Sequence, residues 1–135
     1  MRLKNIPFTK VCPQDTPRPW LFIDIGNPRG KKKIRFLGLI DTGAHECTLP
    51  AHYASLLGFK LKAGEKKKII TGNGTAVAYS HKAVIEVGDY RIRNVFIDFA
   101  PHLNVVLLGT KGFLTRFVLT LDYPHKRFSL ENRKK

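Results

Sequence analysis

The residues best suited to chemistry lie in one short segment, Gly38-Leu39-Ile40-Asp41-Thr42-Gly43-Ala44. An apolar run leads straight into an acidic residue, a hydroxyl and a glycine. A carboxylate at the end of a buried strand is partly removed from water, which disfavours the ion unless partners stabilise it. Thr42 can hold the loop through its hydroxyl, and Gly43 lets a backbone, a substrate or a second subunit approach closely. We therefore predict that Asp41 is catalytic, although an ordinary strand-to-turn junction contains the same residue types. The residues that support its loop are Thr42, Gly43 and Ala44.

A second apolar segment, residues 104–109, lies well downstream and continues into residues 110–114. Together with Asp41-Thr42-Gly43-Ala44 it resembles the retropepsin family, the retroviral-type aspartic proteases and their cellular and bacterial relatives. The resemblance covers residues from about 20 to 130. It implies that the apolar strand passes beside the catalytic loop and leads into a short helix. The residues expected beside the loop are Leu107, Leu108 and Gly109.

Between these two segments the family has a flap, a hairpin that closes over the substrate. Residues 69–77 match it in this chain, and two glycines around an asparagine suit the positive φ angles of a tight hairpin. Backbone groups at the tip would bind the peptide while water is excluded. The alternative is an ordinary surface hairpin. The expected flap residues are Thr71, Gly72, Asn73 and Gly74.

Two positions depart from the family pattern. Retropepsins often have an acidic residue soon after the alanine of the catalytic loop, paired with an arginine that follows Leu-Gly, and here these positions hold His45 and Thr110. Because both halves are missing together, the pair looks replaced as a unit, and Glu46 could partly take its place. Cys47 stands where threonine is frequent. A buried structural thiol is favoured over a nucleophile, because the pattern implies no histidine base.

The chemistry of this family needs two carboxylates that share one proton, so that one acts as base and the other as acid. The chain has six aspartates, and only Asp41 is followed by Thr or Ser and then Gly. The second carboxylate must then come from Asp41 of a second copy on a two-fold axis. The resemblance implies a homodimeric aspartic endopeptidase that acts on peptide or protein substrates. It implies no metal and no organic cofactor.

Short strands are the elements that must position these residues. Apolar alternation and turn residues predict strands at residues 20–25, 34–40, 67–71, 77–87, 90–99, 104–108, 119–123 and 127–130. A short helix is expected within 50–57, and one or two helical turns within 110–116. This pattern predicts an all-β barrel or sandwich, and the resemblance narrows it to a closed barrel of the acid-protease type with a flap hairpin. Residues 1–19, with four prolines, are predicted to form an irregular arm or an early edge strand, and residues 20–135 the protease domain.

The charge of the chain is strongly basic, with 24 Lys and Arg against 10 acidic residues and a formal net charge of +14. The densest clusters are 31–33, 66–68 and 133–135. These Lys-rich segments could recruit an acidic or nucleic-acid partner, or they could be solvated loops. Two readings without proteolysis stay open. One is a retropepsin fold kept as a dimerisation or binding module, and the other is a basic β-barrel that binds nucleic acid.

Targeting and redox signals are few. No stretch reaches the roughly 18 to 20 consecutive apolar residues of a spanning helix, and the N-terminal residues lack an apolar signal core. Cys12 and Cys47 show no metal spacing and make a poor disulfide framework. The histidines show no ligand spacing either. We expect a soluble, cytoplasmic protein with no membrane span.

Overall fold

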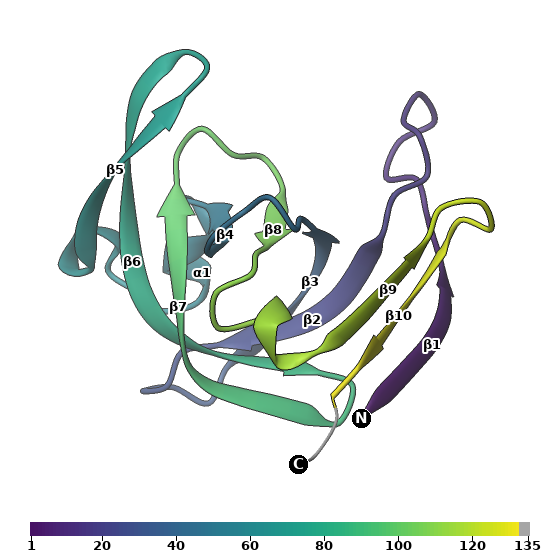
Figure 1. Cartoon of the computed structure of the whole chain (residues 1–135). Helices are drawn as coiled ribbons and strands as arrows, with labels where there is room; N and C mark the ends of the chain where they lie inside the picture. Colours follow the sequence, from purple (N-terminus) through teal and green to yellow (C-terminus); the bar gives the residue numbers. More distant parts are fainter. Residues whose placement is uncertain (133–135) are drawn as a thin grey trace.

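The computed structural model describes residues 1–132, and strands dominate it (Figure 1). The strands are β1 (Arg2–Pro7), β2 (Trp20–Gly26), β3 (Lys33–Ile40), β4 (Cys47–Pro50), β5 (Glu65–Thr71), β6 (Gly74–Val87), β7 (Tyr90–Ala100), β8 (Val106–Leu108), β9 (Val118–Asp122) and β10 (Arg127–Glu131). The helical segments are α1 (Tyr53–Leu56) and two 3₁₀ helices, η1 (Leu61–Ala63) and η2 (Leu114–Arg116). None of the helices in this part of the chain is long and apolar enough to cross a membrane.

Most of the strands form a closed barrel. The larger sheet has the order β2-β3-β8-β4-β7-β6-β5, and β6 also pairs with β2, so that six of its strands close on themselves. β5 pairs only with β6 and forms with it a hairpin that projects from the barrel (Figure 1). The prediction of an all-β closed barrel with few helices is confirmed.

Alternation of side chains gives the barrel its core. In β2, Leu21, Ile23 and Ile25 are buried, while Phe22 between them is 62% exposed. Successive side chains of a strand point to opposite faces, so this period of two places one row of residues inside. The inward rows of the other barrel strands add further fully buried residues, among them Phe99. The predicted strands are found with their ends shifted by at most three residues.

The strand β4 was not expected from the sequence. It has only four residues and ends in Pro50, which suggested the start of a helix instead. In the structure it pairs in parallel with β7 and through Thr48 with β8, so it completes the barrel wall behind the catalytic loop. The helix that follows begins three residues later, at Tyr53. Such a short strand is stabilised by its two neighbours, which a local pattern does not reveal.

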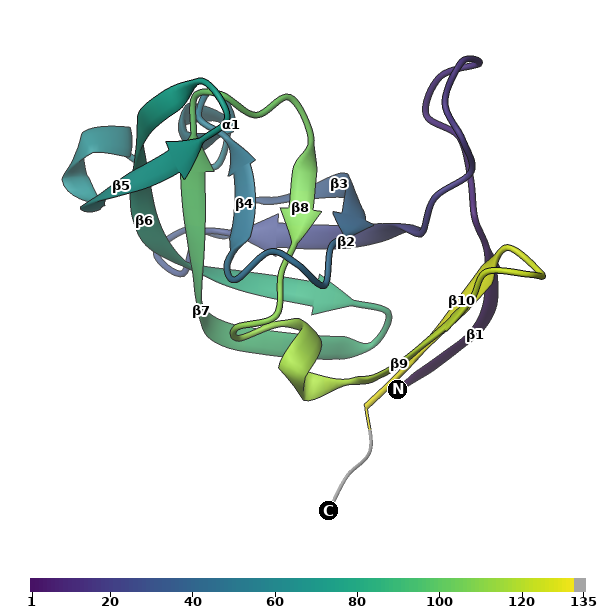
Figure 2. The ribbon, with the colours of Figure 1, turned by 45° about the horizontal axis from the view of Figure 1, so that its top comes forward.

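The chain termini form a separate three-stranded sheet in the order β1-β10-β9. Figure 2 shows this sheet standing to one side of the barrel, with β1 and β10 side by side. The expectation of an irregular N-terminal arm is wrong for residues 2–7, which form the alternative, an edge strand. Between β1 and β2 a single bridge joins Thr9 and Arg18. The basic cluster at 133–135, and with it the end of the predicted domain, lies outside the described residues.

Candidate active site

Asp41 begins the loop that joins β3 to β4, the catalytic loop of the prediction (residues 41–46). β3 runs parallel to β8 with Ile40 opposite Leu108, and the Asp41 N–H donates to the Leu108 carbonyl at 3.0 Å. The loop thus starts where two apolar strands end side by side. The strand formed by Leu107 and Leu108, with Gly109 after it, lies beside the loop.

The loop is held mainly by its own backbone. The Gly43 N–H donates to Asp41 Oδ1 at 3.0 Å, and the Ala44 N–H donates to the Asp41 carbonyl at 3.1 Å. A Cβ at Gly43 would lie only 3.3 Å from the same carboxylate oxygen. Thr42 differs from the expectation, because its side chain is exposed and its hydroxyl has no hydrogen-bond partner among residues 1–132. Within one chain, Thr42 does not hold the loop.

The second half of the loop crosses the segment that leaves β8 at very short range. A Cβ built on Gly109 would overlap the Glu46 carbonyl and lie 2.9 Å from the Ala44 oxygen. Only glycine fits between these two backbones, since real Cβ atoms do not approach backbone oxygens so closely. The Leu-Gly ending of the apolar strand is therefore a packing requirement of the loop beside it.

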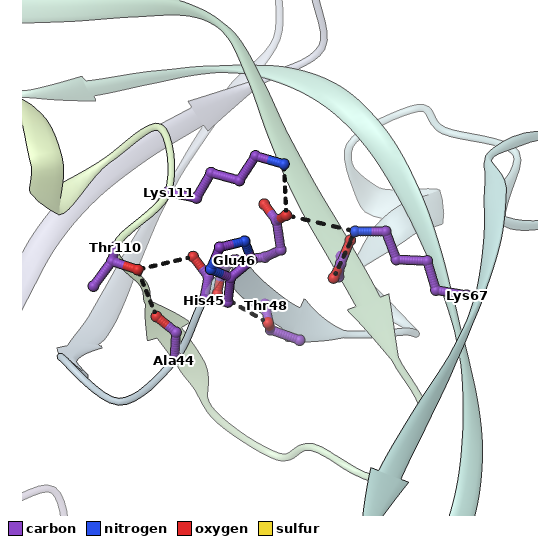
Figure 3. Close-up of polar contacts among 8 residues, drawn as sticks. Ala44, His45, Glu46, Thr48, Lys67, Thr110 and Lys111 are labelled. Atoms are coloured by element: carbon purple, nitrogen blue, oxygen red, sulfur yellow. Dashed lines mark hydrogen bonds and ion pairs between the residues drawn. The ribbon is translucent and has the colours of Figure 1, made fainter.

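Thr110 joins the segment after Gly109 to the catalytic loop by hydrogen bonds, where the family often has an ion pair (Figure 3). Its hydroxyl donates to the carbonyls of Ala44 at 3.2 Å and His45 at 3.4 Å, and its N–H donates to the Ala44 carbonyl at 2.9 Å. The next residue, Lys111, donates its N–H to the His45 carbonyl at 2.7 Å. The His45 side chain is exposed. The loop thus keeps its tie to the segment after Gly109 without the acid and arginine that the family often places there.

A charged cluster lies directly behind the loop (Figure 3). Glu46 Oε1 is 3.4 Å from Lys111 Nζ and 3.6 Å from Lys67 Nζ, and Lys67 Nζ is also 3.2 Å from Asp98 Oδ1. The two carboxylate side chains are only 9% and 6% exposed, whereas Lys67 is 32% exposed. Glu46 Oε2 is buried without a hydrogen-bond partner. Glu46 does bridge the loop to the segment after Gly109, one position later on each side than the family pair.

The charge of Lys67 is fixed by this cluster. Partial burial opposes its ammonium, but the hydrogen bond and charge of Asp98, with the charge of Glu46, outweigh that effect and raise the pKa of Lys67 above its ordinary value of 10.5. Lys67 is therefore a permanent cation at neutral pH. It connects β5, a strand of the projecting hairpin, to β7 in the barrel wall.

Asp41 differs electrostatically from the other acidic residues of the chain. Seven of the ten acids take part in ion pairs, and two of the remaining three, Glu65 and Asp89, are exposed. The paired acids are Asp15, Asp24, Glu46, Glu86, Asp98, Asp122 and Glu131. Asp41 alone is half-buried with no basic partner among residues 1–132. Its carboxylate is available for chemistry, whereas the paired carboxylates are engaged in structure.

The thiol next to the loop is inert. Cys47 is fully buried, and burial, with smaller contributions from Glu46 and Asp98, raises its pKa to about 12. A nucleophilic cysteine needs its thiolate, so this residue is a structural thiol, as expected. Cys12 is exposed and both cysteines are free. Among the described residues, no group of three or more His, Cys, Asp or Glu side chains could hold a metal ion.

The hairpin at the predicted flap is formed by β5 and β6, with Thr71 opposite Gly74 and the two-residue turn between them. The positive φ falls on Gly74, at 110°, whereas Gly72 is outside the left-handed region and has open space around it. The argument from positive φ therefore holds for one glycine of the two. Ile70, one residue before the end of β5, is 90% exposed.

Sequence reasoning missed three residues of the site: Lys67, Asp98 and Lys111. Lys67 stands in a run of three lysines that reads as a solvated strand, and Asp98 interrupts the apolar end of β7. An acidic residue within a buried strand is the one signal that could have pointed to a buried partner, because a buried carboxylate requires one.

Comparison with known proteins agrees with this geometry. The family described as "gag-polyprotein putative aspartyl protease" matches residues 29–116, which is more than half of the chain. Among solved structures, a retropepsin-like aspartic protease from Rickettsia conorii is 22% identical, with a TM-score of 0.71 over 96% of this chain and 98% of that one. The EIAV protease complexed with the inhibitor HBY-793 is 20% identical, with a TM-score of 0.52 over 75% of this chain and 88% of that one.

The two structural likenesses concern the fold, and the family match concerns the sequence from the β2–β3 turn to η2. No curated protein matches the chain. The matched segment contains the catalytic loop, the projecting hairpin and the strand that ends in Leu-Gly. The chain therefore belongs to the family described as gag-polyprotein putative aspartyl protease, and its fold is that of the retropepsin-like structures.

Proposed function

We propose that the protein is an aspartic endopeptidase whose active site contains Asp41 from each of two identical chains. The observation that carries this proposal is the half-buried Asp41 carboxylate, which has no basic partner among the described residues of its own chain. Two such carboxylates a few ångströms apart cannot both ionise readily, so a pair would hold one proton between them. One copy supplies a single Asp-Thr-Gly, and a second copy would supply the other.

In this site a water molecule would bind between the two carboxylates. The ionised carboxylate takes a proton from the water as the water oxygen bonds to the carbonyl carbon of the scissile peptide. The protonated carboxylate polarises the carbonyl oxygen, and a proton is then delivered to the nitrogen as the C–N bond breaks. The products are a new carboxyl end and a new amine, and the dyad returns to one shared proton.

The surroundings of Asp41 fit this role. Gly43 fixes one carboxylate oxygen by its N–H and carries no side chain that would obstruct the site. The exposed Thr42 is available to a second copy, since no residue from 1 to 132 binds its hydroxyl. The β5–β6 hairpin would close over the peptide as a flap, and Ile70 near its tip, 90% exposed, would gain contacts on closure.

A comparison of Asp41→Asn with the wild type tests the function. Both proteins are incubated with a proteome-derived peptide library at several pH values from acid to neutral, and cleavage is read by mass spectrometry. Asp41→Asn keeps the shape and removes the base, so we expect cleavage to disappear while the thermal transition is kept. Asp89→Asn is the matched control, because Asp89 is exposed in the β6–β7 turn and has no ion-pair partner among residues 1–132. Cleavage by Asp41→Asn at the wild-type rate would refute the proposal.

A further inference from the structure

The turn between β2 and β3 stands at the end of the barrel away from the catalytic loop. The two lie at opposite ends of β3, with the turn before Lys33 and Asp41 directly after Ile40 (Figure 1). The turn is surrounded by exposed cations from four parts of the chain. We call them the basic face and define it by Arg29, Lys31, Lys32, Lys60, Lys82 and Arg93.

The basic face is not neutralised by the chain itself. None of its six cations has a carboxylate partner among residues 1–132. The nearby acid, Glu86, is already shared between Lys33 at 2.7 Å and Arg91 at 3.6 Å. Like charges gathered on one surface repel each other, and an anionic ligand relieves that repulsion. The charge of the face therefore favours an anionic partner over a basic or apolar one.

The surface of the basic face is hollowed. One hollow of about 520 Å³ is lined by Lys31, Lys32 and Arg93, among others. A second hollow of about 490 Å³ is lined by Arg29, Lys60 and Lys82. Asn27 and Asn94 line both hollows, so the two are neighbours around one turn. Each is of the size that receives a small organic ligand, such as a nucleotide, and is much larger than a single carboxylate needs.

Aromatic rings lie among these cations. Phe59 and His81, both partly exposed, line the second hollow with their ring centroids 4.9 Å apart. Phe96, 42% exposed, has Lys82 Nζ at 5.6 Å from its ring centroid. Nucleobases stack on such rings while the phosphates meet the cations, which is how sequence-tolerant single-strand binding works.

We propose that the basic face binds single-stranded nucleic acid, with phosphates on its cations and bases against its exposed rings. This function is separate from peptide hydrolysis and uses none of the residues of the catalytic loop. An acidic peptide would satisfy the charges but would supply no base to stack on the partly exposed rings of Phe59, His81 and Phe96. A duplex would present its phosphates and keep its bases stacked inside, so the rings again favour a single strand. Binding at this end of the barrel leaves Asp41 free for a second copy.

Fluorescence anisotropy of labelled single-stranded 20-mers, one of RNA and one of DNA, tests the proposal on the full chain. For single strands the logarithm of the binding constant falls with the logarithm of salt by about 0.7 per phosphate neutralised, so three to six contacts give a slope of about −2 to −4. The variant K31E/K32E is expected to weaken binding at least about tenfold near 0.1 M salt and to make the slope shallower by about 1.4. The RNA and DNA arms show which sugar is preferred.

The control is K66E/K68E, which changes the net charge equally on β5, outside the basic face. It should keep the wild-type slope, and unchanged thermal transitions would show that both variants are folded. Phe96→Leu separates stacking from charge, since it should lower the affinity several-fold with no change of slope. Equal losses in the two lysine variants would overturn the proposal, because binding would then follow net charge alone. Tighter binding of polyglutamate, or equal binding of a duplex, would also overturn it.

Discussion

Lys67 is the residue on which the charge balance behind the catalytic loop depends. It reaches from β5 to Asp98 and Glu46, two carboxylates that are almost fully buried. When one member of a buried ionic cluster is removed, the remaining charges lose their partner without regaining water. The loss is then larger than the net contribution of the intact cluster. Lys67 therefore holds the projecting hairpin to the barrel through charge as well as through the ladder with β6.

Lys67→Met keeps most of the apolar stem and removes the ammonium. We expect the free energy of unfolding at neutral pH to fall by about 2–3 kcal/mol. This is less than for a fully buried pair, because Lys67 is 32% exposed and water screens its interactions. Urea denaturation monitored by tryptophan fluorescence measures the change, since the chain has a single tryptophan, Trp20, in its core.

Lys68→Met is the matched control, because Lys68 is exposed on the same strand and has no ion-pair partner in the described part of the chain. Lys68→Met should change the free energy of unfolding by no more than about 0.5 kcal/mol.

The raised pKa of Lys67 also determines how this stabilisation depends on pH. A cation with a raised folded-state pKa contributes fully below its unfolded pKa, here near 10.5, and the contribution is lost as the pH rises through the folded value. The difference between the variants should thus persist from about pH 6 to about pH 9. Equal stability of both variants would contradict the ionic role.

Single residues were predictable where the signal was local. Asp41 and Gly43 could be found from the sequence, because the order of residue types within a few positions specifies a strand that ends in a tight loop. The place of Gly109 beside that loop came from the resemblance to a family. Lys67 and Asp98 could not, because they meet only through the pairing of β5 with β6 and of β6 with β7. The exposed side chain of Thr42 was not foreseen either, since its orientation depends on the loop backbone as a whole.

At the scale of elements, two glycines of the β5–β6 hairpin that differ in backbone conformation test whether the hairpin acts as a flap. Gly74 has a φ of 110°, a backbone conformation that residues with a side chain rarely adopt, whereas the φ of Gly72 is not in this positive range. Gly74→Ala should strain the turn and destabilise its conformation by about 1 kcal/mol. If the hairpin is a flap, kcat/KM for peptide cleavage should fall several-fold in Gly74→Ala while the thermal transition of the barrel changes little. Gly72→Ala should leave both quantities near the wild type.

Two results would contradict that view of the hairpin. Equal loss of thermal stability and activity in Gly74→Ala would assign Gly74 to the scaffold. Full activity in Gly74→Ala would show that the conformation of the turn is not used in catalysis. Stability is measured by calorimetry and kcat/KM with the best peptide from the library, so the two readouts are independent.

Elements were predictable from alternation and turn chemistry. The long strands β6 and β7 have clear inward rows and a Gly-Asp turn between them, and both were expected. β4 was missed because four residues cannot show a period and because Pro50 resembles a helix start. The parallel pairings β3–β8 and β4–β7 also escaped local reasoning. They depend on which strands the closed barrel brings together. The resemblance to a family placed the strand that ends in Leu-Gly beside the catalytic loop, but it did not supply the pairing of β4 with β7.

At the scale of the whole molecule, the two ends of the barrel differ in chemistry. One end presents Asp41, which is half-buried and has no basic partner among residues 1–132. The other presents six cations that have no carboxylate partner among these residues, around two hollows, one of them lined by Phe59 and His81. The terminal sheet stands apart from both (Figure 2). Because of this separation, the proposed pairing of two chains at Asp41 and the proposed binding of nucleic acid at the basic face would not compete for one surface.

The most direct test of the central claim is a mixing experiment with wild type and Asp41→Asn. The two proteins are combined at constant total concentration, left until subunits have exchanged, and assayed for peptide cleavage. If every active site needs Asp41 from both chains, activity follows the square of the wild-type fraction and falls to about a quarter in an equal mixture. A parallel mixture with Asp89→Asn should keep full activity. An equal mixture with Asp41→Asn that retains about half of the activity would show that single chains act alone, and would contradict the account.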